Sequence, residues 1–181
     1  MSDFMARPEA GFLLAALAVF VLGMYLLSRV LQALIARAFK PRATPTPEEP
    51  SDAVIVDGSN VMYWKDGEPD LDVVIEVLAK LFNAGLSPGV MFDANAGYLV
   101  SERYMHDGAF AKRLGVPKAN VLVVPKGTPA DATILKAARD MGGRVVTNDR
   151  FRDWAEEYPE VLEDGFLIKG GYQEGKLWLS A

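Results

Sequence analysis

Hydrophobic residues follow two unlike patterns along this chain. Residues 11–27, GFLLAALAVFVLGMYLL, carry no charge, and these 17 residues would span roughly 26 Å as a helix, near the lower limit for crossing a bilayer core. Residues 28–40 instead place apolar residues on one helix face and basic residues elsewhere, which is typical of an amphipathic segment at a membrane interface. We therefore predict a transmembrane helix with an amphipathic extension over residues 1–40, contacting lipid through residues 10–39.

The charges around the apolar run predict its orientation. Arg7 precedes the run, whereas four basic residues follow it: Arg29, Arg37, Lys40 and Arg42. The positive-inside rule then predicts a single-pass membrane protein whose C-terminal domain lies in the cytoplasm. A cleaved signal peptide is the alternative, with residues 36–38 imitating a cleavage site, but the acidic residues before the run and its length favour an anchor.

The pattern changes again after residue 40. Residues 41–52 include PRATPTPEEPS, with four prolines in eleven residues, which predicts an extended, semi-rigid linker. Beyond it, short β-branched runs alternate with amphipathic stretches. The expected strands are 53–56, 89–92, 121–124 and 144–147, and the expected helices are one capped by Asp70 and ended by Gly85, one around 102–114 and one over 129–141.

This alternation predicts an α/β domain over residues 53–181, with a mostly parallel sheet and helices on both faces. Parallel neighbouring strands need a crossover between them, and a helix normally supplies it. Residues 165–179 break the alternation, because two short apolar runs flank glycine-containing turns. That segment predicts short edge strands or a hairpin.

The amino-acid composition excludes several kinds of binding site. The net charge is -5, and the 14 basic and 20 acidic residues after residue 50 give that part about -6, which excludes a globally basic nucleic-acid binder. An acidic domain can still act on RNA if some of its acids hold metal ions. The absence of cysteine excludes disulfides and thiolate-bound zinc, and the single histidine, His106, excludes a multi-histidine metal site. We expect His106 to be a surface helix residue without a role.

Five aspartates are placed where chemistry is expected in such a fold. Ligands of open α/β sheets bind beyond the carboxyl ends of the strands. Asp57, Asp93 and Asp149 each follow an apolar strand, and Asp131 and Asp153 lie in the first turn of helices entering the same edge. A cluster of carboxylates is unfavourable unless a cation or shared proton neutralises it, and oxygen ligands suit Mg²⁺ or Mn²⁺. Taken singly, each aspartate is also a plausible helix cap or turn residue.

Three motifs resemble those of the NYN-type PIN-like ribonucleases, the group that includes Regnase-type catalytic domains. They are VIVDGSNVM at 54–62, PADATI at 129–134 and VTNDRFRD at 146–153. The resemblance covers about residues 54–158 and implies a PIN-like, Rossmann-like fold. It also implies that Asp57, Asp131, Asp149 and Asp153 are catalytic acids that coordinate or orient metal, and that Asn60 fixes the loop or a bound water.

The chain departs from this family pattern at one position. Where many relatives carry two consecutive acids, it has Ala130 followed by Asp131. A second metal is then held weakly, or Asp93 contributes in place of the missing acid.

We therefore expect a membrane-anchored, metal-dependent endoribonuclease that cleaves single-stranded RNA phosphodiesters by metal-activated water. Candidate phosphate contacts are Arg150, Arg152, Lys126, Lys112 and Arg113. Candidate surfaces for stacking on unpaired bases are Tyr63, Trp64 and Tyr98. A homo-oligomer stays open.

Two other functions compete with this one. The first is an aspartate-based phosphatase or phosphotransfer domain. Ser59 disfavours a phosphatase, because it stands where haloacid-dehalogenase-like enzymes have a second aspartate, and a receiver-like domain, suggested by Lys169, needs an acidic pair that strand one lacks. The second is a catalytically incomplete, membrane-held interaction module. Dinucleotide binding is excluded, because no G-x-G-x-x-G follows the first strand.

Overall fold

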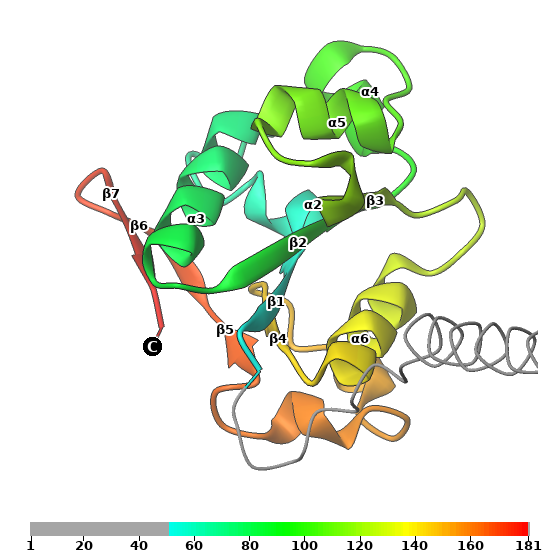
Figure 1. Ribbon diagram of the computed structural model, residues 1–181, viewed down its shortest axis with the longest axis vertical. Coiled ribbons are helices and arrows are strands. Elements are labelled where there is room, and N and C mark those ends of the chain that lie inside the picture. The colour runs from blue at the N-terminus through cyan, green and yellow to red at the C-terminus, as the bar shows by residue number, and fades with distance from the viewer. Residues whose placement is uncertain (1–50, 181) are drawn as a thin grey trace, which may run out of the picture. The chain divides into compact units, whose positions relative to one another are not determined.

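The computed structural model describes residues 51–180, and a parallel five-stranded sheet with the order β3-β2-β1-β4-β5 forms its centre (Figure 1). The strands are β1 (Ala53–Asp57), β2 (Ser87–Phe92), β3 (Val121–Val123), β4 (Arg144–Val146) and β5 (Leu167–Ile168). All four neighbouring pairs run parallel. The predicted parallel α/β sheet is confirmed, and β1 occupies its middle.

Helices lie on both faces of this sheet. The α-helices are α2 (Gly58–Val61), α3 (Leu71–Asn83), α4 (Ala96–Ser101), α5 (Asp107–Leu114) and α6 (Ala130–Met141), and the 3₁₀ helices are η1 (Lys118–Asn120), η2 (Arg152–Trp154) and η3 (Pro159–Leu162). In Figure 1, α3 and α5 cover one face and α6 covers the other. This is the layered arrangement that the crossovers of a parallel sheet require.

The alternation of side chains along β1 divides the core in two. Val54 and Val56 are fully buried in the cluster that contains α3 and α5, whereas Ile55 is buried against α6. Successive strand residues point to opposite faces, so a strand covered on both sides must be apolar throughout. Burial of each such side chain stabilises the fold by about 1.5–3 kcal/mol. This burial holds β1 in place within the sheet and so fixes the position of Asp57, the residue that follows Val56.

Helix α3 follows the sequence prediction closely. Asp70 caps it, with Oδ1 accepting from the Asp72 backbone N–H at 2.8 Å. The expected inward residues, which are Val73, Val74, Val77, Leu78 and Leu81, are all buried. Gly85 follows the helix end in a left-handed conformation, with φ of +77°.

The helix expected around residues 102–114 starts later than predicted, since α5 covers only residues 107–114 of this segment. A separate helix, α4, precedes the segment, and Glu102 ends α4 in a left-handed conformation with φ of +56°. The chain turns here because Met105 must bury against α4, so closely that a Cβ on Gly97 would lie 2.5 Å from the Met105 nitrogen. His106 then caps α5, with Nδ1 accepting from the Gly108 and Ala109 backbone N–H groups.

The C-terminal segment forms both of the structures expected as alternatives. β5 pairs with β4 at the sheet edge, and β6 (Gly170–Gln173) and β7 (Lys176–Leu179) form an antiparallel hairpin. The hairpin lies beside α3 in Figure 1. Tyr172 donates to Glu76 Oε2 at 2.7 Å, and Lys80 Nζ donates to the Leu177 carbonyl at 3.1 Å, which hold the hairpin against α3.

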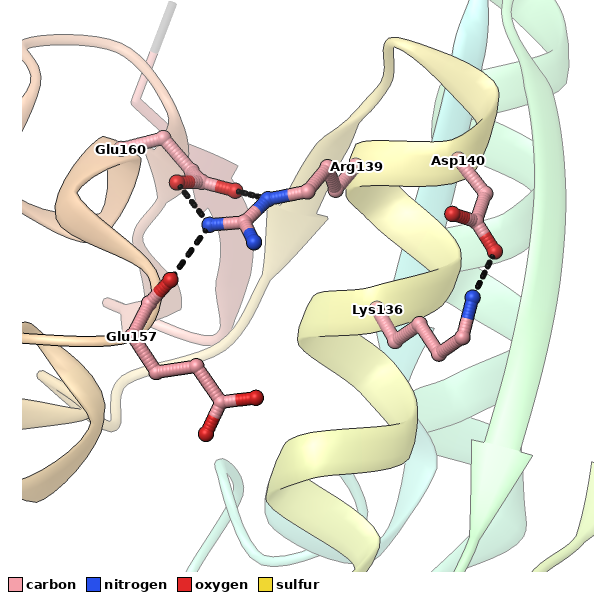
Figure 2. Close-up of polar contacts among 5 residues, drawn as sticks. All are labelled: Lys136, Arg139, Asp140, Glu157 and Glu160. Carbon is pink, nitrogen blue, oxygen red and sulfur yellow. Dashed lines mark hydrogen bonds and ion pairs between the residues drawn. The ribbon is translucent and has the colours of Figure 1, made fainter.

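Arg139 joins α6 to the segment that carries η2 and η3 (Figure 2). Its Nε and Nη2 each donate to Glu160 at 2.7 Å, and Nη2 also donates to the Glu157 carbonyl at 2.7 Å. Such a two-pronged pair has defined geometry, whereas the neighbouring Lys136–Asp140 pair is well exposed and contributes little. The Arg139 contacts therefore hold η3 and the residues just before it against α6.

The predicted transmembrane helix, its amphipathic extension and nearly all of the linker lie outside residues 51–180. Within the range that the structure describes, no helix is both long enough and apolar enough to cross a membrane.

Candidate active site

Asp57 lies at the carboxyl end of the central strand and is only 7% exposed. Its Oδ1 accepts from the Asn60 backbone N–H at 3.1 Å, and its Oδ2 accepts from the Thr147 hydroxyl at 3.0 Å. Burial raises the pKa of Asp57 to about 6, and repulsion from Asp131 and Asp149 adds to this, while the two hydrogen bonds oppose it. A buried acid with this pKa is a usual sign of a functional site.

The loop after β4 brings a second acid to the same edge. Thr147 is fully buried, and its hydroxyl oxygen accepts from the Asp149 backbone N–H at 3.1 Å. Asp149 Oδ1 in turn accepts from the Phe151 N–H at 2.8 Å, which closes a tight turn. Because β1 and β4 are parallel neighbours, this turn lies directly beside Asp57.

Asn60 links the two loops. Its Oδ1 accepts from the Asn148 backbone N–H at 2.9 Å and from Trp64 Nε1 at 2.8 Å. The expected loop at 58–61 is the short helix α2, and it needs Gly58, because a Cβ there would lie 2.4 Å from the Phe92 ring. The side chain of Asn60 therefore fixes the loop after β1 against the loop after β4.

Asp131 and Asp153 complete the group of acids. Asp131 lies in the first turn of α6 and Asp153 in the first turn of η2, as predicted. Burial raises the pKa of Asp131, and repulsion from Asp149 and Asp153 raises it further, although a hydrogen bond from Trp154 Nε1 to Asp131 Oδ2 at 3.3 Å opposes the shift. Pro129 occupies the cap position of α6 and makes no side-chain hydrogen bond there.

The acids lie within electrostatic range of one another without forming a closed ligand cage. Within residues 51–180, no three His, Asp or Glu side chains are grouped so as to hold a metal ion as they stand. Coulomb repulsion acts over longer distances than metal–oxygen bonds of about 2 Å. The acids can therefore raise one another's pKa values without lying close enough together to share a metal ion. The donor set, with carboxylates and no sulfur or imidazole, fits Mg²⁺ or Mn²⁺ chemically.

The fifth predicted acid, Asp93, has local partners. Its backbone N–H donates to Ser59 Oγ at 2.9 Å, and its Oδ1 accepts from the Asn95 N–H at 2.7 Å. These bonds tie the end of β2 to α2. A metal-binding role for Asp93 stays a prediction.

The predicted phosphate-binding residues are all exposed, but they are spread over the surface. Arg150 and Arg152 lie within the segment that joins Asp149 to Asp153. Lys126 lies in the loop that leads to α6, whereas Lys112 and Arg113 lie in the last turn of α5, on the other face of the sheet. Sequence position places Arg150 and Arg152 closest to the acids.

The sequence analysis gave no role in this nuclease site to Thr147 or Trp154, and it considered Lys169 only for a receiver-like site. The buried Thr147 follows an apolar strand, and a hydroxyl residue at that position could have been recognised from the sequence as a site residue. Trp154 and Lys169 carry no such signal, since only folding brings Trp154 to Asp131 and Lys169 Nζ to within 2.5 Å of the Asp149 carbonyl. Burial also lowers the pKa of Lys169.

A surface hollow of about 310 Å³ lies along β2 and the start of β3. Ser87, Pro88, Ala119 and Asn120 are among its lining residues. None of the five predicted aspartates lines it. We therefore place the candidate site at the carboxyl edge.

A parallel α/β sheet with aspartates at its carboxyl edge is the arrangement that the resemblance to PIN-like nucleases implied. Residues 50–165 match the sequence profile of the Zc3h12a-like Ribonuclease NYN domain. The chain belongs to this family, and the expected NYN-type ribonuclease domain is confirmed. By sequence, the chain is not significantly similar to any curated protein.

Solved structures show the same fold. Two structures of the protein-only RNase P 2 (PRORP2) of Arabidopsis thaliana resemble this chain, one with a TM-score of 0.55 and 20% identity over 70% of this chain, the other with 0.56 and 19% over 84%. This chain spans 29% and 36% of the length of those proteins, and at such identities the likeness shows the fold alone. The PIN domain endonuclease Utp24, at 15% identity over 72% of this chain and 92% of that one, has a TM-score of 0.36, too low to indicate a common fold.

Proposed function

We propose that this ribonuclease domain is a divalent-metal-dependent endoribonuclease that cuts single-stranded RNA. The observation that carries the proposal is the buried Asp57, whose pKa is raised to about 6 and which lies within repulsive range of Asp131 and Asp149. Acids kept together at a cost in free energy are typical of a site that a cation completes.

Asp57, Asp131, Asp149 and Asp153 would hold Mg²⁺ or Mn²⁺, and Asp93 would contribute in place of the acid that Ala130 replaces. When bound, such an ion activates water and stabilises the leaving 3′-oxygen. The other residues position these acids. Asn60 joins the β1 and β4 loops, Thr147 orients Asp57, and the Trp154 indole holds Asp131.

RNA contacts would come from cations and aromatic residues around this edge. Arg150 and Arg152 are exposed between the acids and suit phosphate binding. Tyr63 is 37% exposed and Tyr98 is 54% exposed, and each follows a strand end at this edge, after β1 and β2 respectively. Exposed rings stack on unpaired bases, which favours single-stranded RNA as substrate.

A circular single-stranded RNA tests the proposal, because only an endonuclease can open it. The full chain in mild detergent should linearise the circle with Mg²⁺ or Mn²⁺ and stop in EDTA. Asp149→Asn should abolish cleavage, whereas Asp140→Asn, which changes an exposed acid of α6, should cut like wild type. Cleavage that persists in EDTA or in Asp149→Asn would contradict the proposal.

The competing phosphatase function predicts another result. Hydrolysis of p-nitrophenyl phosphate that depends on Asp57, without cleavage of the RNA circle, would favour it. If neither substrate reacts, an interaction module without activity is favoured.

We also propose that residues 1–40 anchor the domain to a membrane, with the domain in the cytoplasm. The support is the uncharged run of 17 residues and the basic residues that follow it. A fluorescent fusion of the full chain should stay with membranes after alkaline extraction, and protease added to sealed cells should leave its C-terminal domain intact. A fusion lacking residues 1–40 that remains membrane-bound would contradict the anchor.

A further inference from the structure

The segment after residue 165 lies beyond the matched family region, yet it contacts the acid-bearing loop. The family match ends at residue 165, and β5 with the β6–β7 hairpin follows it. We call residues 166–180 the C-terminal strap. The strap runs along β4 at the sheet edge and then passes beside α3 (Figure 1).

Three successive residues of the loop bond to three successive residues of the strap. The Thr147 N–H donates to the Ile168 carbonyl at 3.1 Å. The Asn148 side chain donates to the Gly170 carbonyl at 2.9 Å and accepts from the Gly170 N–H at 3.2 Å. Between them, Lys169 Nζ donates to the Asp149 carbonyl at 2.5 Å.

The main chain of Lys169 is itself held from both sides. Its N–H donates to Ser180 Oγ at 2.8 Å, and its carbonyl accepts from the Ser180 N–H at 2.7 Å. The hairpin between these residues is bonded to α3 through Tyr172 and Lys80. Lys169 therefore extends its ammonium from a fixed backbone, which suits it to hold a neighbouring loop.

We propose that Lys169 is a positioning residue of the acid site, whose ammonium fixes the Asp149 carbonyl and thereby sets the direction of the Asp149 carboxylate toward Asp57. A charged donor makes a stronger hydrogen bond than a neutral one, and its charge also offsets repulsion among the acids. Residues outside the matched family region thus complete the site. The consequence for catalysis rests on the proposed ribonuclease function, but the positioning of the loop does not.

Amide hydrogen exchange in the full-length, metal-free protein tests the positioning directly. Lys169→Met keeps the aliphatic stem and removes the donor, so exchange at residues 149–151 should become about tenfold faster. Lys169→Arg restores a charged donor and should slow it again. Lys176→Met, which changes an exposed lysine of β7 and leaves the contacts of Lys169 and of α3 intact, is the matched control and should leave exchange there unchanged.

Binding of Mn²⁺, measured from the electron paramagnetic resonance signal of the free ion, tests the consequence for the site. Lys169→Met should weaken Mn²⁺ binding and lower kcat by about tenfold each, with KM for RNA little changed. Wild type that neither binds Mn²⁺ nor cuts RNA would overturn the proposed function alone. Unchanged exchange at 149–151 in Lys169→Met, equal effects of Lys169→Met and Lys176→Met, or tighter Mn²⁺ binding in Lys169→Met would overturn the role of Lys169. If Lys169→Met fails to fold, Lys169→Gln takes its place.

Discussion

The Thr147 hydroxyl donates a 3.0 Å hydrogen bond to Asp57 Oδ2 across the boundary between β4 and β1. The same hydroxyl oxygen accepts from the Asp149 N–H at 3.1 Å. One buried side chain therefore connects the central acid with the backbone of the neighbouring acid.

Thr147→Val should remove both bonds while keeping the volume of the side chain. Asp57 Oδ2 and the Asp149 N–H would lose their partner, so the free energy of unfolding should fall by about 1–3 kcal/mol. The pKa of Asp57 should rise further, because this bond lowers it. Urea unfolding of the metal-free protein measures the first effect. Thr147→Ser keeps the hydroxyl and is the control, so an equal loss in both variants would show that the methyl group matters instead.

Asp57 should make the metal-free protein less stable as the pH rises. Its pKa is about 6 in the folded state and 3.8 in the unfolded reference, so the folded state binds more protons between these values. The free energy of unfolding should fall from about pH 4 to about pH 6 and lose roughly 3 kcal/mol in all. In EDTA at pH 7.5, Asp57→Asn should be more stable than wild type, although we expect it to lack activity. At pH 4 the two should unfold alike, and a wild type that gains stability over this pH range would contradict the raised pKa.

Gly58→Ala should disturb the contact between α2 and β2. The added Cβ would lie 2.4 Å from the ring of Phe92, which is fully buried and stacked on Phe110 with 4.0 Å between the ring centroids. Since this ring has no free space to move into, we expect a loss of about 1–3 kcal/mol in the free energy of unfolding. Gly89→Ala in β2 is the control, because the nearest atoms to its Cβ lie 3.8 Å away. Thermal unfolding that ranks the two variants equally would contradict this.

Arg150 and Arg152 should bind RNA through charge. Replacing both by alanine should raise KM with little change in kcat, and the dependence of log KM on log salt should become shallower by about 1.4 if each arginine neutralises one phosphate. Lys136→Ala, in which an exposed cation paired with Asp140 is lost, should leave the slope unchanged. The measurement is initial-rate kinetics at several salt concentrations. An unchanged slope in the double variant would show that residues other than Arg150 and Arg152 bind the RNA phosphates.

The parts of the fold with clear periodicity were predictable from the sequence. Helix α3 could be predicted, because its buried residues recur at helical spacing between Asp70 and Gly85. The break between α4 and α5 could not, since it depends on the burial of Met105 and on the close approach of Gly97 to it. The edge strand β5 has only two residues, and its pairing with β4 is a contact that no local pattern encodes.

Local sequence patterns were enough to predict the order of strands and helices and the residue type at each strand end. They therefore also predicted that Asp57, Asp131, Asp149 and Asp153 lie at one edge of the sheet. They did so because hydrophobic periodicity and turn residues act locally. Tertiary structure alone decided which groups surround those acids. Thr147 and Lys169 reach the site only when β4 lies between β1 and β5, and burial, which no single residue encodes, is what raises the pKa of Asp57.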